Sequence, residues 1–92
     1  MGKTRARLRI SGIVQGVCFR AATVEVARDL GVKGWVRNNP DGTVEALVEG
    51  DEERVKKVIE WCHEGPPMAR VDHVAVGWEA FRDEFDGFAA TL

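Results

Sequence analysis

The sequence contains no apolar run long enough to cross a membrane. A bilayer span needs about 20 consecutive apolar residues, and no stretch of this chain approaches that length. The start of the chain is basic, but the apolar segment that a secretory signal peptide requires does not follow it. Ala6 stands where the myristoylation motif has Ser or Thr. We therefore expect a soluble cytoplasmic protein with no membrane partner.

Cysteine is scarce, and its spacing excludes the common metal and redox motifs. Cys18 and Cys62 are the only two cysteines in 92 residues. The chain has no Cys-x-x-Cys pair, so a zinc or thiol-redox motif is not expected. Two distant thiols in a cytoplasmic protein are more often free than bridged, although the sequence leaves a disulfide open.

The chain also lacks the strong positive charge of a non-specific nucleic-acid binder. Its net charge is -2. Residues 1–40 hold eight basic and two acidic side chains, whereas residues 41–92 hold five basic and thirteen acidic ones. A basic first half can attract an anionic ligand, but a solvated sheet face explains the same charges and is the commoner case. We expect no nucleic-acid partner.

The first 31 residues predict a strand and then a helix. Residues 4–14 alternate between apolar and polar side chains, which is typical of a half-buried strand. The polar face of this strand carries Arg5, Arg7 and Arg9, of which Arg7 and Arg9 are expected to be solvated. After a glycine-containing turn at 15–18, residues 19–30 carry apolar side chains at helical spacing, and Gly31 supplies the stop.

The middle of the chain predicts a hairpin and a second helix. Residues 33–38 and 43–49 read as strands around the turn 39–42, N-P-D-G, where Pro suits the first corner and Gly can take a positive φ. Asp51 is a good N-cap for the helix that follows. Gly65-Pro66-Pro67 ends that helix.

Residues 70–78 predict a fourth strand, and residues 85–91 a short final one. The order β-α-β-β-α-β plus this last strand indicates an α+β fold, the ferredoxin-like α/β sandwich. In that fold two helices cover one face of an antiparallel sheet. We expect residues 1–92 to form a single domain. Many functions share this architecture, so the fold alone does not decide the function.

The expected topology brings two loops together. A crossover through the first helix makes the strands at 4–14 and 33–38 parallel, so the 15–20 loop and Asn38 should lie at one edge of the sheet. Gly16 allows a tight turn, and backbone N–H groups entering a helix can bind a phosphate. The planar guanidinium of Arg20 can hold two phosphate oxygens. An ordinary strand-to-helix turn with an exposed arginine explains the same residues equally well.

Other phosphate motifs are absent. The chain has no G-x-x-x-x-G-K-[ST] loop and no G-x-G-x-x-G fingerprint. A cysteine-based phosphatase needs several residues between its nucleophile and its arginine, so that the loop can wrap the phosphate. Only Phe19 separates Cys18 from Arg20. Cys18 is therefore a poor candidate nucleophile.

Two segments resemble the acylphosphatase family. Residues 12–20, G-I-V-Q-G-V-C-F-R, are similar to its first signature, and residues 34–50, G-W-V-R-N-N-P-D-G-T-V-E-A-L-V-E-G, are similar to its second. The spacing between the segments, the order of elements and the length also match. The resemblance covers nearly the whole chain and has no departure at the positions that matter.

The resemblance implies a role for each matching position. Arg20 would bind the phosphoryl group through its guanidinium, and Asn38 would orient the nucleophilic water through its side-chain amide. Three glycines would serve backbone geometry: Gly12, Gly16 and Gly34. The backbone of one loop would bind the phosphate: Gln15, Gly16, Val17, Cys18, Phe19 and Arg20.

The reaction that the resemblance implies is hydrolysis of the carboxyl–phosphate bond of a small acyl phosphate. It gives a carboxylate and inorganic phosphate without a metal, a cofactor or a covalent enzyme intermediate. The leaving carboxylate has a conjugate acid with a pKa of about 4, so it departs without a general acid. Positioning and charge stabilisation can carry most of such a phosphoryl transfer. We expect the enzyme to be a monomer.

Two other functions remain open. Ferredoxin-like sheets also bind RNA, although the aromatic-rich strand motif of that class is absent. A domain of this kind can also handle carbamoyl phosphate in a larger machine, and the absence of a second domain in this chain argues weakly against that. His63 and His73 are expected to be structural or at the surface. Three tryptophans could stack on bases but are expected to pack against the protein: Trp35, Trp61 and Trp78.

Overall fold

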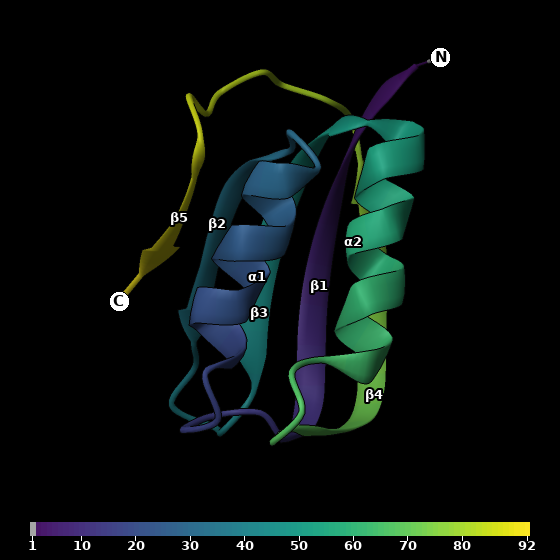
Figure 1. The fold of residues 1–92 in the computed structure, drawn as a ribbon. Helices are drawn as coiled ribbons and strands as arrows, with labels where there is room; N and C mark the ends of the chain where they lie inside the picture. The colour runs from purple at the N-terminus through teal and green to yellow at the C-terminus, as the bar shows by residue number, and fades with distance from the viewer. Residues whose placement is uncertain (1) are drawn as a thin grey trace.

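The computed structural model describes residues 2–92, which run through seven elements in the order that the sequence predicts. These elements are β1 (Lys3–Ile13), α1 (Phe19–Asp29), β2 (Lys33–Asn38), β3 (Val44–Asp51), α2 (Glu52–Glu64), β4 (Arg70–Glu79) and β5 (Phe88–Thr91). Both helices lie side by side on one face of the sheet (Figure 1). The ferredoxin-like arrangement is confirmed.

The strands pair in the order β4-β1-β3-β2-β5. The first four form the antiparallel sheet that the sequence predicts. β5 joins β2 in parallel, so the complete sheet is mixed. This follows from the 80–87 connection, which carries the chain from the β4 edge to the opposite edge (Figure 1).

The hydrophobic core lies between the sheet and the helices. Each helix contributes residues at helical spacing: Phe19, Thr23 and Ala27 from α1, and Val55, Val58 and Cys62 from α2. The rings of Phe19 and Trp61 lie 5.4 Å apart between their centroids. Phe19, the first residue of α1, is 1% exposed. Its burial fixes the N-terminus of α1 against the core.

The face of β1 away from the helices is less open than the sequence predicts. Arg7 and Arg9 are exposed, as predicted, but Arg5 on the same face is only 4% exposed. The 80–87 connection lies over it, and its guanidinium forms ion pairs with three carboxylates, those of Glu49, Glu79 and Glu84. The sequence could not indicate that a distant segment crosses this part of the sheet.

Candidate functional site

The C-terminal ends of β1 and β2 meet at one edge of the sheet, as predicted, because both strands are antiparallel to β3. A cavity of about 300 Å³ lies at this edge. Arg20 and Asn38 both line it. The remaining lining residues come from the loop after β1, from the start of α1 and from β5: Val14, Gly16, Cys18, Phe19, Ala21 and Ala90. The structure therefore brings together the two residues to which the sequence assigns chemistry.

The backbone of the 15–18 turn has two residues in the left-handed region. Gly16 has φ 72°, and Cys18 has φ 66° and ψ 20°. Turns of this kind aim successive N–H groups into one concavity, which suits an anion. Phe19 is buried in the core, so its backbone, rather than its side chain, is what it can offer a ligand. The sequence pointed to Gly16, but nothing in it indicated a left-handed cysteine.

The N-terminus of α1 is not neutralised by the chain itself. The first amides of a helix have no intrahelical acceptor, and within Phe19–Asp29 the first turn has no acidic residue, while Cys18 makes no side-chain capping bond. In α2, by contrast, the Asp51 carboxylate accepts a hydrogen bond from the Glu53 amide at 3.1 Å. The start of α1 thus keeps its positive partial charge for an external anion.

The guanidinium of Arg20 makes no hydrogen bond or ion pair with any side chain or carbonyl of residues 2–92. The other arginines of the first 40 residues all have an acceptor. Their partners are Glu49 for Arg5, Glu79 for Arg7, Asp41 for Arg9, the Phe88 carbonyl for Arg28 and Glu45 for Arg37. Arg20 therefore has all of its donors available to a ligand in the cavity.

Asn38, the last residue of β2, has a side-chain oxygen that is buried and unpaired. Among the residues from Gly2 to Leu92, none donates a hydrogen bond to Oδ1. Buried polar atoms normally have a partner, which is often an ordered water. The carboxamide lies at the cavity and is free to hold a water molecule there.

The side chain of Gln15 links the loop after β1 to the turn after β2. Its Nε2 donates to the carbonyl oxygens of Asn39 at 2.8 Å and Thr43 at 2.9 Å. Both acceptors belong to the turn that follows Asn38, so this one amide fixes the loop after β1 to the end of β2. The sequence placed Gln15 only among the backbone groups of the loop, and its side-chain role has no signal in the letters.

The turn after Asn38 is itself held by side chains. Asn39 Nδ2 donates to the hydroxyl of Thr43 at 3.0 Å, and that hydroxyl donates to Asp41 at 2.6 Å. The hydroxyl and the amide of Thr43 lower the pKa of Asp41 below its usual value. Asp41 therefore stays ionised and serves the turn, as the sequence predicts.

On the outer face of the sheet, Glu45 accepts hydrogen bonds from Arg37 at 2.9 Å and from Arg7 at 3.2 Å. Burial alone would raise the pKa of Glu45, but the two guanidinium groups outweigh it, and the net effect is a lowered pKa. The hydrogen bonds that Arg7 donates to Glu79 and, more weakly, to Glu45 raise the pKa of Arg7. This cluster is separate from the cavity.

The other residues that suggested chemistry are structural or at the surface. Both cysteines are free, with Cys18 exposed and Cys62 in the core. Burial raises the pKa of the Cys62 thiol to about 12, which makes it inert. His63 and His73 are exposed, as predicted, whereas Trp78, which was expected to be packed, is 52% exposed.

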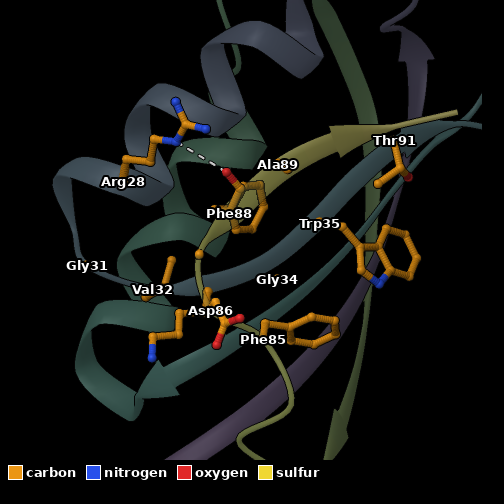
Figure 2. A pocket seen from close by; sticks show the side chains of 12 residues that line it. Arg28, Gly31, Val32, Gly34, Trp35, Phe85, Asp86, Phe88, Ala89 and Thr91 are labelled. Carbon is orange, nitrogen blue, oxygen red and sulfur yellow. Dashed lines mark hydrogen bonds between the residues drawn. The ribbon is translucent and has the colours of Figure 1, made fainter.

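A larger hollow of about 710 Å³ lies between the segment 31–35 and the segment 85–89. Trp35, Phe85 and Ala89 are among the residues that line it (Figure 2). Arg28 at its margin donates to the carbonyl oxygen of Phe88 at 3.2 Å. Gly34 also lines this hollow, but none of the residues predicted to bind the phosphate or the water does. Its larger volume therefore does not make it a better candidate for the functional site than the cavity that Arg20 and Asn38 line.

The part of the chain that the structure describes has neither a group of metal-ligating side chains nor a membrane-spanning helix. From Gly2 to the C-terminus, no three His, Cys, Asp or Glu side chains are grouped as metal ligands. Over the same residues, no helix combines the length and the apolar character that crossing a membrane requires.

The chain matches known proteins over nearly its full length. The family model described as Acylphosphatase matches residues 6–90. An acylphosphatase of Thermococcus kodakarensis is 62% identical over 79 residues, which are 86% of this chain and 87% of the relative. The structure of an acylphosphatase from Coxiella burnetii, 34% identical, superimposes with a TM-score of 0.91 over 97% of this chain and 93% of that one. HypF of T. kodakarensis, 29% identical, has a TM-score of 0.84 over 97% of this chain but only 12% of its own.

Proposed function

Since the chain belongs to the acylphosphatase family, we infer that it hydrolyses the carboxyl–phosphate bond of small acyl phosphates to a carboxylate and inorganic phosphate. One observation carries the proposal for the site. The unpaired guanidinium of Arg20 and the unpaired carboxamide oxygen of Asn38 line one small cavity at the start of α1.

In the proposed mechanism the 15–20 loop binds the phosphoryl group. Backbone N–H groups of Gln15 to Arg20 donate to its oxygens, and the positive end of α1 favours their charge. The guanidinium of Arg20 donates two parallel hydrogen bonds to the same group. The protein then needs no metal to offset the phosphate charge, because these donors are fixed before the substrate arrives.

The water is held by Asn38. Its buried Oδ1 accepts a hydrogen bond from one O–H of the water and so aims a lone pair of the water oxygen at phosphorus. The attacking and leaving oxygens lie roughly in line in such a displacement, so the carboxylate departs on the side away from Asn38. It leaves as an anion and needs no proton. The second proton of the water passes to a phosphate oxygen.

The test is phosphate release from acetyl phosphate compared with a phosphate monoester such as phenyl phosphate. We expect rapid release from the first and none above background from the second. Addition of a chelator should leave the rate unchanged. Equal turnover of the ester, or loss of activity that a divalent ion restores, would contradict the proposal.

The family match removes the support for an RNA-binding module, since nothing besides the fold class favoured one. The likeness to a small part of HypF supports a second candidate function, which is action on carbamoyl phosphate within a larger assembly. Carbamoyl phosphate as a third substrate in the same assay tests this candidate.

We further propose that residues 1–92 act as one domain and as a cytoplasmic monomer. Two unbridged cysteines support the cytoplasmic location. Light scattering on the purified protein measures the oligomeric state.

A further inference from the structure

One wall of the cavity comes from β5, which the sequence did not connect with the site. Ala90 lines the cavity together with Arg20 and Asn38. Ala21, in the first turn of α1, is a second small residue at the same cavity. Neither alanine can bind phosphate through its side chain or act on a proton. What they determine is the space left beside the phosphoryl group.

The register of the sheet fixes where Ala90 stands relative to Asn38. Ala90 pairs with Val36 on β2, and Asn38 follows two residues later, so all three side chains project to the helix-covered face. One strand spacing and two residue rises separate the Cα atoms of Ala90 and Asn38 by about 8 Å. That span is wide enough for a phosphoryl group between a water held at one end and an acyl group at the other.

The wall is held firmly in place. The Gly34 amide donates to the Gly87 carbonyl at 2.9 Å, just before β5 begins. Arg28 donates to Phe88 within it. The connection leading to β5 is anchored to β3, because the buried Glu49 carboxylate accepts hydrogen bonds from two of its backbone amides. These are the amides of Arg82 at 2.8 Å and Glu84 at 3.3 Å. A larger side chain at position 90 would therefore fill the cavity, since the strand that carries it has little freedom to retreat.

We propose that Ala90 is a specificity-determining residue: its small side chain leaves the space beside the bound phosphoryl group in which the acyl substituent of the substrate lies. The inference rests on the proposed function and extends it to the substrate class. The cavity volume of about 300 Å³ is at the small end for ligand sites. It accommodates a phosphoryl group and a compact acyl group of up to the size of a single aromatic ring.

The experiment compares acetyl phosphate with benzoyl phosphate in the native protein and in the variants Ala90→Leu and Ala90→Val. The measured quantity is the ratio of kcat/KM for the two substrates. Ala89→Leu is the matched control, because Ala89 is the next residue of the same strand, pairs with Trp35 and lines the separate hollow in Figure 2. Competitive inhibition by inorganic phosphate reports on the phosphoryl subsite alone.

We expect Ala90→Leu to lower the benzoyl-to-acetyl ratio at least about tenfold, since one misplaced methylene group in a pocket changes discrimination by about 10- to 200-fold. Ala90→Val should lower the ratio less, and Ala89→Leu should leave it within about twofold. The inhibition constant of phosphate should change less than the ratio does. If Ala90→Leu does not fold, as judged by circular dichroism, the Ala90→Val variant decides.

An unchanged ratio in the folded variant would overturn the inference. So would an equal loss for both substrates, because it would place Ala90 beside the phosphate or the water and not beside the acyl group. A shift in Ala89→Leu as large as that in Ala90→Leu would also contradict it. Failure of the proposed function looks different: the native protein would then hydrolyse neither acyl phosphate.

Discussion

Replacement of Arg20 should separate catalysis from stability. Its guanidinium has no internal partner in residues 2–92, so its loss removes no contact from the fold. We expect Arg20→Ala to change the free energy of unfolding by less than about 0.5 kcal/mol. Two charge-assisted hydrogen bonds to phosphate, each contributing about 1.5–3 kcal/mol, would be lost. At 1.4 kcal/mol per factor of ten, kcat/KM should fall by about 10²- to 10⁴-fold.

Arg20→Lys tests the proposed two-point contact with phosphate more specifically than Arg20→Ala does. It keeps the positive charge but not the planar pair of donors, so about half of the lost stabilisation should return, and kcat/KM should remain about 10- to 100-fold below the native value. The assay is phosphate release from acetyl phosphate, with urea unfolding measured in parallel. Arg82→Ala is the matched control, since Arg82 is exposed, makes no side-chain contact with the described residues and lies in the 80–87 connection. Full activity of Arg20→Lys, or an equal loss in Arg82→Ala, would refute the reasoning.

Three further predictions test other parts of the structure. Asn38→Ala should lower kcat by about 10²- to 10³-fold with little change in KM, as expected when a group acts mainly in the transition state; an unchanged kcat in steady-state assays would remove it from the mechanism. Gly34→Ala should destabilise the fold, because its Cβ would lie 1.8 Å from the Leu47 carbonyl oxygen at a φ of 139°. We expect a loss of more than about 3 kcal/mol and a thermal midpoint lower by more than about 12 °C. Gly42→Ala, also at positive φ but with open space around it, should cost about 1 kcal/mol. Glu45→Gln should make the stability of the fold less sensitive to acid. The folded-state pKa of Glu45 lies below its usual value of 4.5. Its ion pairs therefore stabilise the protein above about pH 4.5, and this stabilisation is lost as the pH falls further. Urea unfolding between pH 7 and pH 3 measures the difference, and identical pH profiles would contradict it.

The sequence was sufficient for the elements whose signals are local. β2 has the predicted bounds, and α1 and the hairpin turn differ from the prediction by one or two residues, because periodicity and glycine or proline stops act over short range. The meeting of Arg20 and Asn38 was also predictable, since it depends only on the parallel direction of β1 and β2. Topology therefore decided which residues share a site without any side-chain detail.

What the sequence could not show depends on segments distant along the chain. β5 begins at Phe88 and not at residue 85, because the last part of the 80–87 connection is held over Arg5, with the ring of Phe85 5.8 Å from its guanidinium. The side-chain bonds of Gln15 and the place of Ala90 at the cavity likewise arise only when strands far apart in sequence are paired. Alternation marks which face a residue takes, but not what lies over that face.

The composition of the cavity bears directly on the choice of reaction. Among its eight lining residues there is no His, Asp or Glu, so the cavity lacks the imidazole or carboxyl group that most often protonates a departing oxygen. An alkoxide leaving from a phosphate monoester needs that proton, because its conjugate acid is far weaker than a carboxylic acid. A carboxylate does not need it. A site made of amides, one guanidinium and one carboxamide can therefore bind both kinds of phosphate but lower the barrier substantially for only one of them. We therefore expect selectivity for the anhydride to depend on the lack of an imidazole or carboxyl acid in the cavity as much as on the groups that are present.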